Sequence, residues 1–140
     1  MFSPLSEPTE YENSLANRII GCAMIVHRQF GPGLLETVYE TCFCHELVKT
    51  GLEVHRQKSQ PIIYDGIIFE DPFRLDLLVE NTIIVENKAV EIVLPLHKAQ
   101  VRSYLKLSNR RLGLLINFNV PYINSTCPTS RMAFSEKRMG

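Results

Sequence analysis

The chain has 140 residues, of which 45% are hydrophobic, and its 15 basic residues balance 15 acidic ones. This length and composition suit one compact domain with its own core. The balanced charge argues against a protein that grips nucleic acid through a large overall positive field, although it leaves room for local basic patches. No apolar run approaches the length of a membrane span, and the N-terminal stretch MFSPLSEPTEYEN lacks the basic region of a signal peptide. We therefore expect a cytoplasmic protein without a membrane segment.

The first half of the chain has helical patterning after a short polar start. Residues 1–11 contain two prolines and are expected to form a loose N-terminal arm. Apolar residues then recur at helical spacing from about residue 12 to residue 30, where a Gly-Pro-Gly sequence breaks the pattern. A second helix is predicted over residues 34–50, and Gly51 is placed to end it. Its apolar side is expected to include Leu35, Val38, Tyr39, Cys42, Phe43 and Leu47.

The second half of the chain has strand-like patterning around one further helix. The strand candidates are residues 52–57, 61–64, 67–69, 73–79, 83–89 and 111–118, and the helix is predicted over residues 95–107. Asp65-Gly66 is the strongest hairpin signal in the chain. Residues 124–140 are expected to form an irregular C-terminal tail, so that the predicted domain spans residues 12–123. The order α-α-β-β-β-β-α-β predicts an α/β (α+β) domain with one central sheet.

The stretch FRLDLLVENTIIVENKA at residues 73–89 places Asp76, Glu86 and Lys88 among apolar residues. A three-residue loop, Glu80-Asn81-Thr82, would bring Asp76 directly opposite Glu86 on antiparallel strands. In this register the two acids share one face of the sheet with Lys88 and Arg74. The other face would be aliphatic, with Leu75, Leu77, Val79, Ile83 and Val85. A two-residue turn would instead drive the Glu86 charge into the aliphatic face, which is costly for an unpaired charge.

Such a cluster has two interpretations. Two neighbouring carboxylates repel each other and raise at least one pKa unless a cation lies between them. Lys88 supplies one cation, and a divalent ion would supply more, because Mg²⁺ binds one or two carboxylates together with substrate phosphate and water. A lysine beside such an ion can orient a water for attack on phosphorus. The alternative interpretation is a structural ion pair between Lys88 and one of the acids on an exposed strand face.

Three motifs carry a resemblance to a known family. Asp76 followed by Glu86-Asn87-Lys88 resembles the D…(D/E)xK signature of the PD-(D/E)XK nuclease superfamily. The stretch GLLETVY at residues 33–39 resembles the G-x-x-E-x-x-Y signature of the GxxExxY protein family, which is usually placed in that superfamily. Gln100 and Tyr104 resemble the Q-x-x-x-Y motif of its exonuclease branches. The resemblance covers about residues 13–122 and implies an αβββαβ core with a central mixed sheet flanked by helices.

The resemblance also implies roles for single residues. Asp76 and Glu86 would bind Mg²⁺ or Mn²⁺, with the backbone carbonyl of Asn87 as a further ligand. Glu36 would be the helix-borne acid that helps to complete the metal site, although a carboxylate in a first helical turn also favours the helix dipole. Lys88 would position the attacking water or stabilise charge on the phosphate. Gln100 and Tyr104, one helical turn apart, would orient the site or the substrate, whereas Tyr39 is expected to be a core residue.

The predicted function is a metal-dependent nuclease that acts on DNA or RNA. The alternative is a catalytically silent module on the same fold that binds nucleic acid or protein, because fold alone does not determine function. The chain has little beyond the core that could recognise a substrate, so a homo-oligomer or a protein partner is compatible with either function. Loss of activity on changing Lys88 would distinguish the two, because lysine is not an expected metal ligand here.

Overall fold

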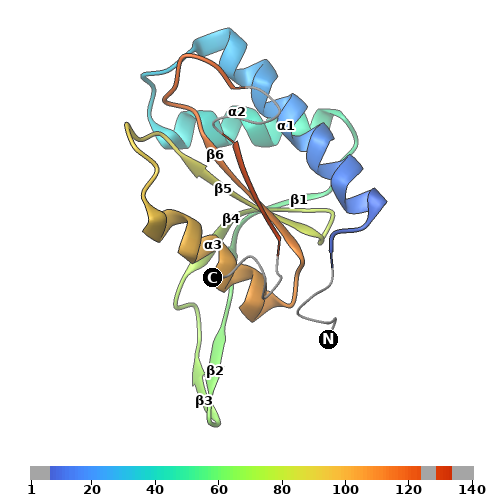
Figure 1. Cartoon of the computed structure of the whole chain (residues 1–140), viewed down its shortest axis with the longest axis vertical. Helices are drawn as coiled ribbons and strands as arrows, with labels where there is room; N and C mark the ends of the chain where they lie inside the picture. Colours follow the sequence, from blue (N-terminus) through green and yellow to red (C-terminus); the bar gives the residue numbers. More distant parts are fainter. Residues whose placement is uncertain (1–6, 124–128, 134–140) are drawn as a thin grey trace.

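The computed structural model describes residues 7–123 and 129–133. A mixed sheet forms the centre, helices α1 and α2 cover one of its faces, and α3 covers the other (Figure 1). The elements are α1 Glu10–Phe30, α2 Glu36–Lys49, β1 Val54–Ser59, β2 Ile62–Tyr64, β3 Ile67–Phe69, β4 Arg74–Val79, β5 Ile83–Lys88, α3 Pro95–Ser108, β6 Leu112–Asn117 and β7 Thr129–Ala133. This architecture confirms the predicted fold class.

The first helix begins earlier than the sequence pattern predicts. Thr9 is its N-cap and accepts a hydrogen bond from the backbone N–H of Glu12, while the Glu12 carboxylate accepts one from the backbone N–H of Thr9. This capping box satisfies two backbone donors that a helix start otherwise leaves unpaired. Glu10 and Tyr11 are therefore helical, although they belong to the predicted arm of residues 1–11.

The central sheet contains five strands in the order β1-β4-β5-β6-β7. β5 and β6 run parallel, and the other neighbouring strands are antiparallel. The parallel pair is connected by α3, which returns the chain across one face, as parallel strands require a crossover. β5 and β6 are thereby buried in the middle of the sheet, which explains their long apolar runs.

The predicted element order needs two corrections. All five strand candidates between α2 and α3 form strands, so the predicted order, which counts four there, is one strand short, and β2 and β3 form a separate two-stranded sheet. Residues 129–133 form β7, which pairs with β6 and extends the sheet by one strand. The predicted irregular tail of residues 124–140 therefore contains a strand that is supplied by pairing with a distant neighbour, while the rest of that segment lies outside the described residues.

The core consists of two apolar clusters on opposite faces of the sheet. The cluster under α1 and α2 includes Tyr39, Phe43 and Phe118, which are fully buried. The cluster under α3 is smaller and centres on Val101 and Leu105. The remaining buried apolar side chains of the smaller cluster come from the sheet: Leu75, Leu78, Ile84 and Leu115. Each face of the sheet is thus held by its own helix layer.

The apolar side of α2 is narrower than its sequence pattern suggests. Tyr39, Phe43 and Leu47 are fully buried, but Leu35 is 75% exposed and Val38 is 39% exposed. Leu35 is the N-cap of α2 and precedes its first helical residue, so its side chain does not follow the buried stripe of the helix. The prediction that these two residues face the core is therefore wrong.

Candidate active site

The charged pair lies where β4 and β5 stop pairing. The ladder runs from Val79↔Ile83 to Leu77↔Val85, which is the register predicted from a three-residue loop. Glu80 and Asn81 in this loop both adopt positive φ angles, 52° and 50°. Asp76 and Glu86 are the next residues beyond Leu77↔Val85, the last pair of this ladder. Both acids therefore lie where β4 and β5 cease to pair.

The backbone around Asp76 is distorted on its other side too. β1 pairs with β4 at Arg56↔Leu77 and Lys58↔Leu75, but Gln57 between them has a positive φ of 52° and does not pair with Asp76. The distortion changes the alternation of side chains along β4. Leu75 packs in the cluster under α3, whereas Leu77 packs under α1 and α2. The prediction that Leu75 and Leu77 share a face is therefore wrong, because it assumes a regular strand through Asp76.

Beyond the end of the β4–β5 ladder, each carboxylate accepts a hydrogen bond from a backbone N–H of the neighbouring strand. The backbone N–H of Asp76 donates to Oε1 of Glu86 over 3.2 Å, and the backbone N–H of Asn87 donates to Oδ2 of Asp76 over 2.9 Å. Each acid is thus held by a backbone donor of the partner strand. These bonds fix the two side chains against each other.

Burial and mutual repulsion govern the protonation of this pair. Burial raises the pKa of Glu86 to about 9, and the nearby charge of Asp76 adds to this effect. Burial also raises the pKa of Asp76, although the backbone N–H of Asn87 partly stabilises its charged form. Lys88 favours the charged forms of both acids, but its effect on their pKa values is smaller than that of burial. Without a further cation the pair therefore retains a proton at neutral pH.

Helix α2 adds two acids from the neighbouring layer. Burial raises the pKa of Glu36, and the charge of Asp76 raises it further, while Lys88 partly offsets both effects. Glu40 lies one turn further along α2 and also raises the pKa of Asp76 by repulsion. The sequence analysis did not single out Glu40. Glu40 lies four residues after Glu36, so the two side chains share one helical face. This spacing could have identified Glu40 as a member of the site.

Glu40 is held by the distorted part of β1. Its carboxylate accepts hydrogen bonds from Nη2 of Arg56 over 3.1 Å and from Nε2 of Gln57 over 3.1 and 3.2 Å. The Glu40 side chain is almost fully buried, whereas that of Arg56 is 41% exposed. Glu40 therefore links α2 to the distorted part of β1 through an ion pair with Arg56 and hydrogen bonds from Gln57. Arg74, by contrast, pairs with Asp71 over 2.6 Å and does not join the acids.

Helix α3 contributes Tyr104 from the opposite face of the sheet. Burial raises the pKa of the Tyr104 hydroxyl, and the charges of Glu86 and Asp76 raise it further. The ring of Tyr104 stacks on Phe73 with a centroid distance of 4.4 Å, which holds α3 against the start of β4. Gln100 lies one turn before Tyr104 and is exposed. The structure thus brings Tyr104 close to Glu86 and Asp76, whereas Gln100 is exposed to solvent.

Tyr39 supports the loop that leads into Glu36. Its hydroxyl donates to the carbonyl of Gly31 over 2.6 Å and accepts from the backbone N–H of Leu34 over 3.0 Å. Its ring is fully buried and stacks on Phe118 with a centroid distance of 4.7 Å. The prediction that Tyr39 is a core residue is confirmed for its ring. Its hydroxyl in addition stabilises the turn between α1 and α2 through these two hydrogen bonds.

Comparison with known proteins now adds to this geometry. A model of the PD-(D/E)XK nuclease superfamily matches residues 13–129 of the chain. The protein belongs to the PD-(D/E)XK nuclease superfamily. A search of curated proteins and a search of solved structures each return no match. The narrower assignment to the GxxExxY family stays a prediction.

Nucleases of the PD-(D/E)XK superfamily generally use divalent metals, and the donor chemistry of this site fits a hard cation. Asp76 and Glu86 are buried acids that repel each other, and such a pair gains from a divalent ion between them. Within residues 7–123 and 129–133, however, no three side chains of the types His, Cys, Asp and Glu converge closely enough to hold one ion. The donor set present is therefore a pair of carboxylates, and a bound ion would need water, backbone or substrate oxygens as its remaining ligands.

The side chain of Asn87 is fully buried. Among the described residues, neither its Oδ1 nor its Nδ2 has a hydrogen-bond partner. Its role in the site comes from its backbone, because its N–H donates to Asp76. The resemblance implies a metal-binding role for the Asn87 carbonyl, which stays a prediction.

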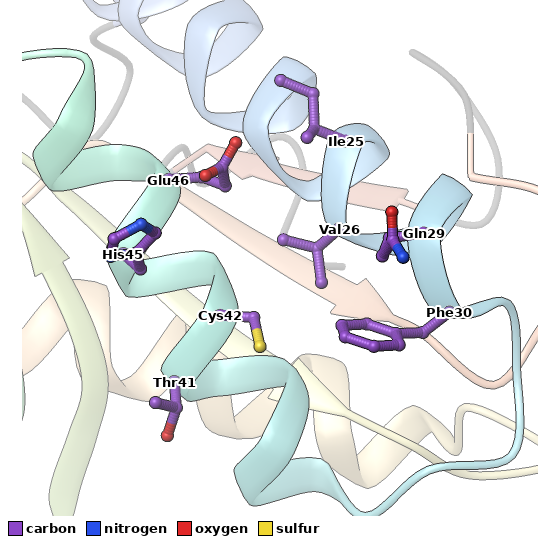
Figure 2. Close-up of a pocket in the computed structure, with 8 residues that line it drawn as sticks. All are labelled: Ile25, Val26, Gln29, Phe30, Thr41, Cys42, His45 and Glu46. Atoms are coloured by element: carbon purple, nitrogen blue, oxygen red, sulfur yellow. The ribbon is translucent and has the colours of Figure 1, made fainter.

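A cavity of about 430 Å³ lies between α1 and α2, and it is separate from the acidic cluster that Glu36, Glu40, Asp76 and Glu86 form. Figure 2 shows Val26 and Phe30 of α1 and Cys42 of α2 pointing toward one another across the space between the two helices. Most of the lining is apolar, and the eight residues are Ile25, Val26, Gln29, Phe30, Thr41, Cys42, His45 and Glu46. None of them is one of the acids Glu36, Glu40, Asp76 and Glu86. No helix in the described part of the chain has the length and apolar character needed to cross a bilayer.

Proposed function

We propose that this protein is a metal-dependent nuclease that hydrolyses phosphodiester bonds in DNA or RNA at the Asp76–Glu86 site. One observation carries the proposal. Two buried carboxylates from adjacent strands are fixed against each other by backbone donors, and burial raises the pKa of both more than Lys88 lowers it. Nothing in the core requires this arrangement, since a pair of aliphatic residues would be more stable there. Its cost is explained if the pair receives a cation during function.

A divalent ion, Mg²⁺ or Mn²⁺, would polarise the phosphoryl oxygen and make a bound water more acidic. Asp76 and Glu86 would hold it, with the backbone carbonyl of Asn87 as a further ligand. Glu36 is the acid that α2 contributes to the proposed site, and the charge of Asp76 adds to the effect of burial in raising its pKa. With raised pKa values, these acids release protons when a cation binds, so that metal affinity should increase with pH.

Lys88 is the residue proposed to act directly on the reaction. It follows Glu86 by two positions on β5 and is partly exposed, so that its ammonium can approach the substrate phosphate while remaining beside the acids. In the hydrolysis a water oxygen forms a bond to phosphorus, and the bond from phosphorus to the leaving sugar oxygen breaks. A lysine ammonium at this position orients the water and stabilises negative charge that develops on the phosphate.

Tyr104 and Gln100 are proposed to orient the substrate. Tyr104 is close enough to the acids for their charges to raise its pKa, and its position is fixed by the stack on Phe73. Its hydroxyl remains protonated at neutral pH and can donate a hydrogen bond to a phosphate oxygen. Gln100 is exposed one turn away on the same helix, where its amide can contact a neighbouring nucleotide.

A cleavage assay tests the proposal. Purified protein is incubated with labelled single- and double-stranded DNA and RNA in the presence of Mg²⁺, Mn²⁺ or EDTA. The variants Asp76→Asn and Lys88→Met remove the proposed ligand and the proposed ammonium, and Lys98→Met is a matched control on an exposed face of α3. We expect metal-dependent cleavage by the wild-type protein and by the control, and none by the other two variants.

Metal binding is measured in parallel by titration calorimetry. This measurement distinguishes a protein that binds metal without cleaving nucleic acid from one that does not bind metal. A folded protein that binds Mn²⁺ but cleaves none of the four substrates would contradict the proposed activity and favour a binding or regulatory module. Cleavage that survives Asp76→Asn and Lys88→Met would show that the activity arises elsewhere.

A further inference from the structure

The hairpin of β2 and β3 projects from the domain as a separate arm (Figure 1). Its two strands pair with each other in the register Ile62↔Phe69, Ile63↔Ile68 and Tyr64↔Ile67. They are joined by Asp65-Gly66, both with positive φ angles as a tight hairpin turn requires. In the described part of the chain no other strand joins this small sheet. The arm is therefore supported by the domain only at its base.

Both faces of the arm are apolar and exposed. Residues directly opposite each other in a ladder share a face, so Ile63 and Ile68 occupy one face, while Tyr64 and Ile67 occupy the other. Ile63 is 69% exposed, Ile68 is 61% exposed and Tyr64 is 70% exposed. A hairpin that only packed on its own domain would be apolar on one face and polar on the other. The pattern here requires a cover for each face.

The arm is also too small to be stable alone. An isolated two-stranded hairpin is marginal in water and needs further strands or a packed partner. Exposed apolar strands with free edges also invite unwanted pairing with other chains. β1, the exposed edge strand of the main sheet, avoids this with polar and charged residues, His55, Arg56, Gln57, Lys58 and Ser59. The arm has no such protection, which indicates that it is covered when the protein functions.

We propose that the arm is the centre of an interface between two copies of this chain. The five most exposed apolar side chains of the arm offer roughly 600 Å² per copy, on the basis of the areas that such side chains bury. A dimer in which both faces of each arm are covered by the other copy would then bury roughly 1,200 Å², which reaches the lower end of the range for specific protein–protein interfaces. A twofold arrangement uses the same patch on both copies, and each arm supplies the strands and apolar surface that the other lacks.

Charge selects a second copy over other occupants. The segment from residue 60 to residue 72 contains no lysine or arginine, and its charged residues are Asp65, Glu70 and Asp71. Nucleic-acid phosphates and anionic membrane surfaces both attract basic residues and would be repelled here. The net charge of zero leaves no long-range repulsion between copies. The two strands of the arm, residues 62–64 and 67–69, carry no charged side chain, and we therefore match them with the same apolar strands of a second copy.

The oligomeric state of the full chain tests the proposal. Sedimentation velocity and light scattering over a wide range of concentrations should give twice the chain mass of 16.0 kDa for the wild-type protein. The double variant Ile63→Lys/Ile68→Lys places two charges on one face of the arm and should give the mass of one chain. Val48→Lys introduces the same chemistry at a residue of α2 that is 55% exposed, and it should remain a dimer. Thermal unfolding checks that both variants are folded.

Hydrogen exchange of the unmodified protein provides a second measurement that does not depend on a variant. Amides of residues 62–69 should exchange rapidly at low concentration and become protected as the protein is concentrated. A wild-type protein that stays monomeric at all concentrations would overturn the proposal. So would a dimer that is unaffected by Ile63→Lys/Ile68→Lys, or arm protection that appears only with added phosphatidylcholine vesicles or nucleic acid.

Discussion

Replacing Glu86 by glutamine removes one of the two buried carboxylates while it preserves the shape of the side chain. The glutamine carbonyl can still accept the hydrogen bond from the backbone N–H of Asp76, and its amide can donate to the Asp76 carboxylate. The substitution therefore eliminates a buried ionisable group with little loss of packing. We expect Glu86→Gln to stabilise the metal-free protein at alkaline pH, although it removes a proposed functional residue.

The magnitude follows from the pKa of Glu86, which is about 9 in the folded protein against 4.5 for an unperturbed glutamate. Between these values the folded state binds more protons than the unfolded state, so the free energy of unfolding falls as the pH rises. The contribution is fully present below the unperturbed pKa and is lost as the pH rises through the folded value. The slope is at most about 1.4 kcal/mol per pH unit. From pH 5 to pH 8 the loss amounts to as much as about 4 kcal/mol.

Thermal unfolding of the metal-free proteins in EDTA measures this effect. The Tm of the wild-type protein should fall between pH 5 and pH 8, and that of Glu86→Gln should change much less. At pH 8 the variant should melt higher by roughly 5–15 °C, given a shift of roughly 4 °C per kcal/mol for a domain of this size. Glu70→Gln, at an exposed position, is the control and should follow the wild-type protein.

Two results would refute the reasoning. One is a wild-type Tm that does not fall between pH 5 and pH 8. The other is a Glu86→Gln protein that is destabilised equally at both pH values, which would show that the carboxylate stabilises the empty site. Addition of Mn²⁺ at pH 8 should raise the Tm of the wild-type protein and leave that of Glu86→Gln unchanged, because only the wild-type protein has both proposed ligands.

Three further substitutions test other parts of the structure. Lys88→Met should lower the cleavage rate at least about 100-fold while calorimetry still detects Mn²⁺ binding, and loss of metal binding would contradict a role in the reaction itself. Tyr39→Phe keeps the buried ring but loses the hydroxyl bond to Gly31, and it should cost about 1–2 kcal/mol in denaturant unfolding; an unchanged stability would show that the hydroxyl does not secure the loop. Gly113→Ala would place a Cβ 2.8 Å from Cγ1 of Val101 and should cost about 1–3 kcal/mol. The added substitution Val101→Ala should relieve this crowding, and a purely additive double variant would argue against the contact.

The site and the arm place different demands on the same fold. The Asp76–Glu86 pair lies at the end of the central strands and draws on both helix layers, with Glu36 from one and Tyr104 from the other. The arm leaves the domain between β1 and β4, the strand that carries Asp76. A dimer formed through the arms would thus carry two sites, each close in sequence to the interface, without using the site residues for the contact.

Local sequence rules were sufficient for the central register. The aliphatic residues of β5 and the three-residue loop between β4 and β5 allow only one pairing that keeps Glu86 out of the apolar layer, and the structure has this register. Hairpin register depends on loop length and on residues close in sequence, so it is readable without a tertiary structure. The same holds for the hairpin turn at Asp65-Gly66 and for the proline that opens α3.

Contacts between residues far apart in the chain decided what the sequence did not reveal. Glu40 joins the acidic cluster only because α2 packs beside β1, where Arg56 and Gln57 hold its carboxylate. Leu75 leaves its expected face because Gln57, on a separate strand, distorts the backbone opposite Asp76.

The sequence by itself therefore determined most of the elements, the fold class, the β4–β5 register that brings Asp76 close to Glu86, and the proximity of Lys88 to both. These features depend on periodicity, turn chemistry and loop length, which act over a few residues. Only the tertiary structure decided that β7 completes the sheet, that Glu40 and Tyr104 reach the acids from different layers, and that the arm stands clear of the domain. The physical reason is that strand pairing and burial are set by distant partners, and neither is encoded in the local pattern of a single segment.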